Sequence, residues 1–227
     1  MNNVDLLCNG TRIVIDKTGR TININPGSSQ LTNITIRYCY FESVSTGMQL
    51  INMTQSHIYD NVINMSSSNP MSLENVYNSI ISNNTIWNVS TDALTLDDVS
   101  HSIFENNTLQ EIYNGYGFRF YNKLPSTNVT IKNSLINVTG GVGIGGWINT
   151  PVIYINDSKF YNNTITNIGD GYSCIEMSGF NNEFISNTFG NCSRPISSGT
   201  STGGSNYLIK SNIFNGSKEN RGFQLYG

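Results

Sequence analysis

Charged side chains are scarce in this chain of 227 residues: they make up 12% of it, about half the usual share. There is no run of Lys or Arg and the net charge is −3, so nucleic acid is excluded as the main partner. No apolar run approaches the length that spans a bilayer, and no basic segment followed by an apolar one opens the chain. We therefore expect no membrane insertion and no secretion signal within this sequence.

Cysteines are few, and they lack the spacing of a metal site. Cys8, Cys39, Cys174 and Cys192 form no CxxC pair and have no His at ligand spacing. We interpret them as buried thiols, with disulfide bonds as the alternative, so they do not decide the redox compartment. His57 and His101 fall at different points of the repeat described below, which argues against a metal or catalytic pair. We expect no cofactor, apart from a calcium ion in one reading of the acidic residues below.

Asparagine is abundant, with 35 residues, and many of them belong to a repeat. Asn84 has Ile81 three residues before it and Ile86 two residues after it, and the same apolar frame recurs along the chain. The reference positions are Asn61, Asn84, Asn107, Asn163, Asn187 and Asn212, with Cys39 and Ser134 as variants of the same frame. Successive positions lie 22 to 29 residues apart, a period that is typical of a solenoid.

A second alternation of apolar residues follows most reference positions. It includes Leu94 and Leu96, then Phe118 and Phe120, then Val142 and Ile144. Alternation predicts strands, and the Gly, Asn, Asp and Ser between them predict turns, while helical periodicity is absent. The sequence therefore predicts an all-β fold: one single-stranded, right-handed parallel β-helix domain of about nine rungs over residues 1–227.

The recurring asparagines have a structural explanation in such a fold. Turns of a parallel β-helix stack about 4.8 Å apart, so equivalent side chains form columns along the axis. Asn tolerates the left-handed backbone of a sharp corner, and its amide donates to one neighbour and accepts from the next. We expect the reference positions to form a corner ladder, in preference to a catalytic role. Thr11, with Cys8 three residues before it, copies the frame, which places Cys8 inward and Cys39 at the corner.

Several stretches resemble a known family. The opening "LLCNGTRIVIDKTG", the segment "NITIRYCYFESVSTGMQL" and the recurring "NNTI" are similar to the repeats of the pectin lyase-like superfamily, especially NosD-like and archaeal cell-surface β-helix proteins. The resemblance covers essentially the whole chain. It implies a β-helix fold but no single function, because the superfamily includes lyases, hydrolases, epimerases, tailspikes and non-catalytic surface proteins.

Catalytic members of that superfamily act on polysaccharides with clustered carboxylates, sometimes with calcium and a basic residue. The candidates here are Glu74, Asp97, Asp98 and Arg119; Glu74 and Asp97 each follow an expected strand and should stack one rung apart. Thr95, Arg119, Gly143 and Glu176 are expected to line up on the outer side of the same strands. The familiar hydrolase and epimerase motifs are missing, so catalysis, a ligand or ion site, and solvated turn residues remain open readings.

Aromatic residues offer a second route to sugar binding. Tyr113, Tyr116, Tyr121 and Trp147 belong to the two longest repeats, whose loops are expected to protrude. Exposed aromatic faces stack on sugar rings, and loops on a rigid scaffold often carry binding residues. The alternative is that these rings cover the ends of the apolar stacks.

Asn-x-Ser/Thr sequons are about twice as frequent as chance predicts. They include Asn9, Asn33, Asn52, Asn83, Asn106, Asn137 and Asn162. The "NNT" corner accounts for part of this excess, and the remainder suggests a glycosylated outer surface.

These observations favour an extracellular or cell-surface domain that acts as a rigid stalk or as an adhesin-like module, with a polysaccharide or glycan as partner. The alternatives are a polysaccharide lyase or glycoside hydrolase, and a segment of a viral tailspike. The chain begins and stops abruptly, so we expect a piece of a larger protein, or self-association through its uncapped ends.

Overall fold

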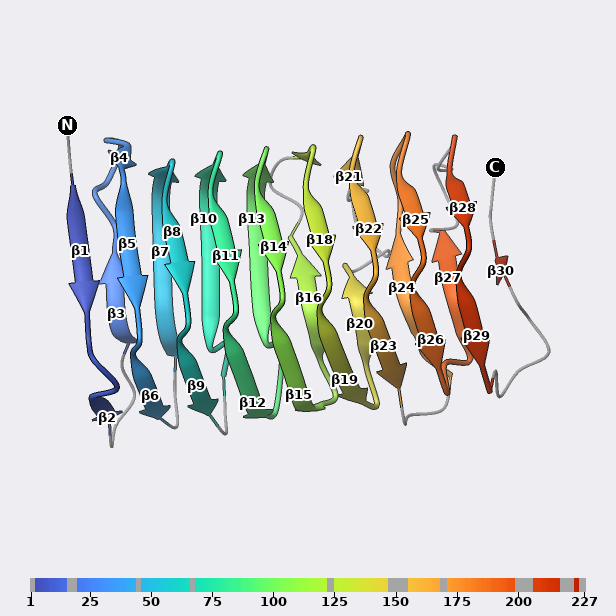
Figure 1. Ribbon diagram of the computed structural model, residues 1–227, viewed down its shortest axis with the longest axis horizontal. Helices are drawn as coiled ribbons and strands as arrows, with labels where there is room; N and C mark the ends of the chain where they lie inside the picture. Colours follow the sequence, from blue (N-terminus) through green and yellow to red (C-terminus); the bar gives the residue numbers. More distant parts are fainter. Residues whose placement is uncertain are drawn as a thin grey trace.

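The structure is a computed structural model that describes residues 3–15, 20–43, 46–65, 68–121, 125–146, 155–167, 171–198, 206–216 and 223–224. Its strands wind into a solenoid, with three long parallel sheets running from the N-terminal to the C-terminal end (Figure 1). All paired strands described are parallel, and each strand of the three long sheets, except the first and last, pairs with its equivalents one turn before and one turn after. The predicted all-β parallel β-helix is confirmed.

Sheet A contains nine strands that precede the asparagine corner. They are β1 (Val4–Leu7), β5 (Ile34–Arg37), β8 (His57–Tyr59), β11 (Ile80–Ser82), β14 (Ile103–Glu105), β18 (Thr130–Lys132), β22 (Lys159–Tyr161), β25 (Glu183–Ile185) and β28 (Leu208–Lys210). Its inward column runs through Ile36, Ile58, Ile81 and Phe104, as the sequence frame predicts.

Sheet B contains nine strands that follow the same corner. They are β2 (Arg12–Ile15), β6 (Tyr40–Ser43), β9 (Val62–Met65), β12 (Thr85–Val89), β15 (Thr108–Tyr113), β19 (Leu135–Thr139), β23 (Thr164–Asn167), β26 (Thr188–Gly190) and β29 (Ile213–Asn215). Among the described residues, the strands of the first turn (β1) and of the last (β28 and β29) leave most of their side chains exposed, so about seven turns have an enclosed core, slightly fewer than the nine rungs predicted.

Sheet C forms the third side of the coil and lies behind sheets A and B in Figure 1. It contains β3 (Arg20–Ile24), β7 (Thr46–Thr54), β10 (Met71–Tyr77), β13 (Leu94–Ser100), β16 (Tyr116–Phe120), β20 (Val142–Gly145), β24 (Ser173–Met177), β27 (Arg194–Ser198) and β30 (Phe223–Gln224). The short strand β4 (Leu31–Thr32) also pairs with β7, and β17 (Ser126–Thr127) pairs with β21 (Ile155–Asn156).

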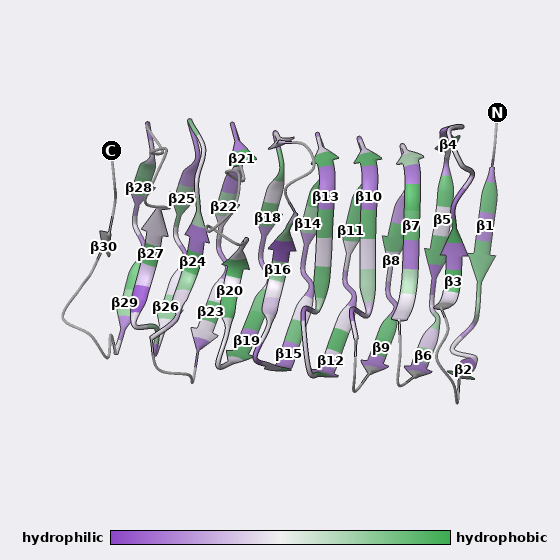
Figure 2. Ribbon diagram, turned by 180° about the vertical axis from the view of Figure 1, so that it is seen from behind, coloured by the Kyte–Doolittle hydropathy of each residue, from purple (hydrophilic) through white to green (hydrophobic). Residues whose placement is uncertain are grey.

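The interior is a continuous stack of apolar side chains. In Figure 2 the apolar residues form green bands on the ribbons of successive strands. Phe160 stacks on Phe184, with ring centroids 5.1 Å apart and an interplanar angle of 14°. Phe189 stacks on Phe214 in the same way. Parallel strands place like residues in register, so identical rings meet face to face across successive turns.

The corner between sheets A and B contains the predicted asparagine ladder. The amide oxygen of Asn84 accepts from the main-chain N–H of Asn61 at 3.1 Å, and its Nδ2 donates to the Ile58 carbonyl at 2.9 Å. Equivalent bonds connect the corner residues from Cys39 to Asn212, and Ser134 takes the same place with its hydroxyl. The asparagines of this column are therefore structural.

A second ladder, which the sequence analysis missed, lies at the corner before sheet A. The hydroxyl of Ser79 accepts from the Ser56 N–H at 3.1 Å, and that of Ser102 accepts from the Ser79 N–H at 3.2 Å. Ser158 and Asn182 continue this column further along. Serine is common in turns of every kind, so the column has no distinctive sequence signal.

The cysteines are disulfide-bonded, and the interpretation as buried thiols is wrong. Cys8 bonds to Cys39 with 4.8 Å between their Cα atoms, and Cys174 bonds to Cys192 with 5.5 Å. The inward partner of Ile36 is Leu6, not Cys8. The first corner holds more residues than the next one, because Leu7 pairs with Arg37 while Arg12 pairs with Tyr40. Cys8 is therefore displaced onto the corner, directly beside Cys39.

One further prediction about sheet C is wrong. Phe118 pairs with Ile144 and Arg119 with Gly145, so Gly145, not Gly143, continues the outward column to Glu176. A register shift in β15 changes the length of that turn, which the sequence frame did not include.

Candidate functional site

Two of the predicted acidic residues meet on the outer face of sheet C. Glu74 on β10 and Asp97 on β13 are direct partners in the parallel register, as expected. Both line a cavity of about 230 Å³, together with Asn69, Ser72, Leu73, Thr95 and Tyr121. The lining thus combines carboxylate, amide and hydroxyl groups with one aromatic ring. We call this set of residues the sheet C cavity.

Asp98, the third predicted acid, does not line this cavity. It lies at a left-handed kink (φ 52°) that follows Asn52 (φ 56°) and Asn75 (φ 53°) in the preceding turns. Asn75 Nδ2 donates to Asn52 Oδ1 at 2.8 Å, and the Tyr77 hydroxyl donates to the Asp98 carboxylate. Burial is the main cause that raises the pKa of Tyr77 to about 12, and the hydrogen bond to Asp98 adds to the effect. Asp98 therefore belongs to a structural column of kink residues.

Arg119 is held by groups that the sequence analysis did not consider together. Its Nη1 lies 2.6 Å from Oδ2 of Asp92, whose other oxygen accepts from the Tyr116 N–H at 3.0 Å. The guanidinium also lies 5.3 Å from the ring centroid of Tyr116 and 4.4 Å from that of Tyr121. Asp92 was missed because it precedes β13 in an irregular turn, outside the alternating pattern.

The charge of Arg119 is secured by these contacts. Burial acts to lower the pKa of Arg119, but the hydrogen bond and the charge of Asp92 outweigh it, so the pKa is raised. Burial also raises the pKa of Tyr116 to about 12. We therefore expect Arg119 to act as a fixed cation that orients the two tyrosine rings, and not as a base.

Glu176 lies further along the same face. Arg119 pairs with Gly145 and Gly145 pairs with Glu176. The turn of the coil that carries Gly145 therefore lies between Arg119 and Glu176. Burial raises the pKa of Glu176, and the charge of Arg194 only partly opposes this effect. The structure therefore keeps Glu176 apart from the Glu74 and Asp97 pair, and it does not line the sheet C cavity.

The predicted aromatic group is divided by the fold. Tyr116 and Tyr121 lie on either side of Arg119 on the sheet C face. Tyr113 ends β15 in sheet B, where its side chain is exposed. Trp147 lies outside the described residues. Of the four residues, only Tyr116 and Tyr121 are thus seen to share one site.

The sequons largely follow the backbone geometry of the corners. Asn9, Asn33, Asn83, Asn106 and Asn162 are exposed, while Asn52 and Asn137 are half-buried. All of these except Asn137 have φ between 50° and 56°, the left-handed region that Asn tolerates. The excess of sequons is therefore accounted for mainly by the corners, and glycosylation of the exposed ones remains a proposal.

Among the described residues, no group of three or more His, Cys, Asp or Glu side chains is arranged to hold a metal ion. No helix in the same part of the chain has the length and apolar character needed to cross a membrane.

Comparisons with known proteins agree on the architecture. A family model described as "Right handed beta helix region" matches residues 2–152. No curated protein matches the sequence. Among solved structures, PfbA, a surface adhesin of Streptococcus pneumoniae, is 14% identical with a TM-score of 0.58, over 82% of this chain and 60% of that one.

Two viral proteins are also similar. ORF18 of Geobacillus virus E2 is 12% identical with a TM-score of 0.54, over 99% of this chain and 54% of that one. The tailspike gp49 of Acinetobacter baumannii bacteriophage Fri1, a capsular polysaccharide depolymerase, is 13% identical with a TM-score of 0.52, over 90% and 47%. At these identities the likeness concerns the fold alone, and this chain spans about half the length of the viral proteins.

Proposed function

The chain belongs to the right-handed β-helix family, and from this premise we propose that it is a rigid extracellular domain that binds a glycan on the outer face of sheet C. Membership of the family does not name a function, because one fold carries many sites. The proposal therefore depends on the chemistry of the side chains on that face.

The observation that carries the proposal is the composition of the sheet C cavity. Glu74 and Asp97 supply carboxylate oxygens that accept hydrogen bonds from sugar hydroxyls, and Ser72 and Thr95 supply hydroxyls that both donate and accept. Tyr121 contributes an aromatic ring beside them. Sugar rings have an apolar face and a polar edge, and this combination of groups complements both.

The surroundings of the cavity support binding with little rearrangement. Five of its seven described residues lie on β10 and β13, whose backbones are fixed by hydrogen bonds to the turns on both sides, while Asn69 precedes β10 and Tyr121 directly follows β16. Tyr121 is further held by Arg119 and by a side-chain hydrogen bond with Asn69. A site whose groups are already in place loses less entropy when it binds a ligand.

An extracellular location is supported by the cysteines. Both described pairs form disulfides, which persist in oxidising environments such as the cell exterior. The similar solved structures include a surface adhesin and a phage tailspike, which act outside or at the surface of cells. A stalk or adhesin-like role agrees with the stiff, repetitive coil.

The test is direct binding of the folded domain to an array of oligosaccharides, followed by calorimetry on any ligand found. Tyr121→Ala and Glu74→Gln should each weaken binding at least tenfold. Tyr161→Ala is the matched control, since Tyr161 lies on sheet A, away from the cavity. Binding that is equally insensitive to all three substitutions, or no saturable binding to any glycan, would refute the proposal.

A second candidate function is glycoside hydrolysis by Glu74 and Asp97. Their strands are direct neighbours, and the spacing of adjacent strands, about 4.8 Å, is near the carboxyl separation of about 5–5.5 Å in retaining enzymes. The assay is release of reducing ends from neutral and acidic polysaccharides. Activity that disappears in Asp97→Asn would establish this candidate, and full activity in that variant would exclude it.

A further inference from the structure

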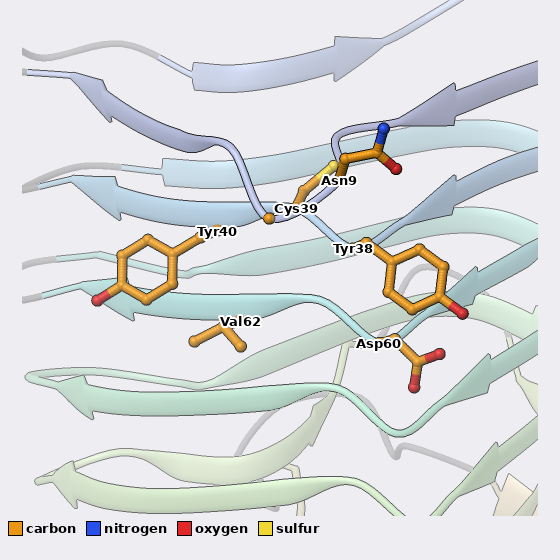
Figure 3. Close-up of a pocket in the computed structure, with 7 residues that line it drawn as sticks. Asn9, Tyr38, Cys39, Tyr40, Asp60 and Val62 are labelled. Atoms are coloured by element: carbon orange, nitrogen blue, oxygen red, sulfur yellow. The ribbon is translucent and has the colours of Figure 1, made fainter.

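A groove lies on the opposite side of the coil from sheet C, at the corner between sheets A and B near the N-terminal end. Its volume is about 490 Å³, within the usual range for small-molecule sites. It is lined by Asn9, Gly10, Tyr38, Cys39, Tyr40, Asp60 and Val62 (Figure 3). We call it the corner groove.

The backbone at Tyr38 makes this groove unusual. Tyr38 directly follows a strand of sheet A and has φ 56°, in the same left-handed corner as Asp60, Asn83 and Asn106 one, two and three turns later. Asn adopts this conformation easily, whereas a bulky side chain is disfavoured there. Among the described residues with positive φ, no other is Tyr, Phe or Trp. A strained residue that the corner itself does not require points to a role for its side chain.

The ring of Tyr38 is supported at its edge. It meets the Tyr59 ring at an angle of 74°, with centroids 5.9 Å apart, and the Arg37 guanidinium lies 6.0 Å from both centroids. Arg37 is fixed in turn by Asp5 at 2.8 Å. Nevertheless, 44% of Tyr38 remains exposed. The contacts hold the ring in place without burying it.

The other walls of the groove are complementary to a sugar. Tyr40 and Val62 are register partners that face outward from sheet B and form a half-buried apolar wall. In Figure 3 the carboxylate of Asp60 lies beside the ring of Tyr38, and the Tyr40 ring lies at the other end of the groove. Aromatic faces with one carboxylate suit the apolar face and the hydroxyls of a pyranose ring.

The charge of the lining selects among sugars. Among the described residues that line the groove, Asp60 alone is charged, so a uronate would meet a carboxylate of like charge, whereas a neutral sugar would not. The disulfide from Cys39 to Cys8 holds the first turn, which carries Asn9 and Gly10, against the second. Both walls of the groove are therefore fixed relative to each other.

We infer that the corner groove is a binding site for neutral saccharides, separate from the sheet C cavity. It would allow the domain to contact glycan from two opposite sides. This inference does not depend on the glycan site proposed for sheet C, because the two sites share no residue.

The test uses saturation-transfer NMR with cellohexaose, maltohexaose, mannohexaose and hexagalacturonate, on the wild type, Tyr38→Asn and Tyr121→Ala. At least one neutral probe should bind the wild type, and Tyr38→Asn should weaken that binding at least tenfold. Because Asn suits the left-handed corner, Tyr38→Asn should also unfold at the same urea concentration as the wild type or a higher one.

Three results would overturn the inference. They are unchanged binding in Tyr38→Asn, absence of binding by every neutral probe, and a clear loss of stability in Tyr38→Asn, which would show that the ring is retained for packing. Loss of binding in Tyr121→Ala but not in Tyr38→Asn would support the sheet C site and contradict this one, so the two proposals fail independently.

Discussion

Replacing the side chain of Asn84 in the corner ladder should destabilise the fold far more than replacing that of Asn83, the adjacent residue in the sequence. Asn84 is almost completely buried, and its side chain joins three successive turns. In Asn84→Ala the Asn61 N–H loses its acceptor at 3.1 Å, and the Ile58 carbonyl loses a donor at 2.9 Å. A buried N–H without a partner costs about 1–3 kcal/mol, and an ordinary hydrogen bond contributes about 1 kcal/mol. We therefore expect a loss of about 2–4 kcal/mol.

The chain itself supplies the intermediate variant. Ser134 occupies the same column, where its hydroxyl accepts from the Asn107 N–H at 3.2 Å and donates to the Lys132 carbonyl at 3.0 Å. Asn84→Ser should keep the acceptor for Asn61 but lose the donor to Ile58. Its cost should be about half that of Asn84→Ala, or about 1–2 kcal/mol.

The matched control is Asn83→Gly. Asn83 is adjacent in sequence, exposed and left-handed at φ 55°, a conformation that glycine adopts freely. Its free energy of unfolding should change by less than about 0.5 kcal/mol.

Urea unfolding followed by circular dichroism measures these differences. With a denaturant slope of about 3 kcal/mol/M, Asn84→Ala should lower the midpoint by about 1 M, and Asn84→Ser by about half as much. If Asn84→Ala and Asn83→Gly have the same midpoint, or if serine costs as much as alanine, the ladder does not stabilise the coil as described.

Three further predictions test other parts of the structure. The protein, unfolded without a reducing agent, should contain no reactive thiol, and labelling of Cys174 or Cys192 would contradict their disulfide. Replacing both residues by alanine should lower the free energy of unfolding by about 3 kcal/mol, because the unfolded chain gains loop entropy. Asp92→Ala should lower the free energy of unfolding by about 3 kcal/mol because it removes the buried partner of Arg119. Asp92→Asn should lower it less, because the asparagine keeps an acceptor for the Tyr116 N–H. Equal losses of stability in the two variants would refute this prediction. Burial raises the pKa of Glu176, so the folded state binds its proton more tightly than the unfolded state does. The free energy of unfolding should therefore fall as pH rises from the usual value of about 4.5 towards the raised pKa. Glu176→Gln should flatten this part of the curve of stability against pH, and identical curves for the two proteins would contradict the prediction.

Much of the architecture was readable from the sequence because a solenoid repeats its chemistry. The frame of Ile81, Asn84 and Ile86 recurs along the coil with equivalent apolar residues, and with Cys39 or Ser134 in place of the asparagine in two turns, since each turn faces the same core and bends at the same corner. The parallel register of Glu74 with Asp97 could be predicted for the same reason. Residues that lie one period apart in the sequence therefore become neighbours along the axis of the coil.

The site was only partly predictable, because its decisive contacts involve residues outside the period. Asp92 reaches Arg119 from an irregular turn, and Tyr121 joins the sheet C cavity just beyond the end of β16. Asp98 looked equivalent to Asp97 but its backbone is left-handed, so its side chain turns towards Tyr77. A single inverted dihedral moves a carboxylate from one group of neighbours to another.

The apolar and asparagine patterns alone were enough to specify the β-helix, its corner column and the stacking of its core, because those features depend on interactions that every turn repeats. Only the folded structure decided the disulfides, the shift from Gly143 to Gly145 and the left-handed backbone at Tyr38. Each of these depends on how many residues one particular turn contains, or on the backbone angle at one residue, and a periodic pattern averages over such differences.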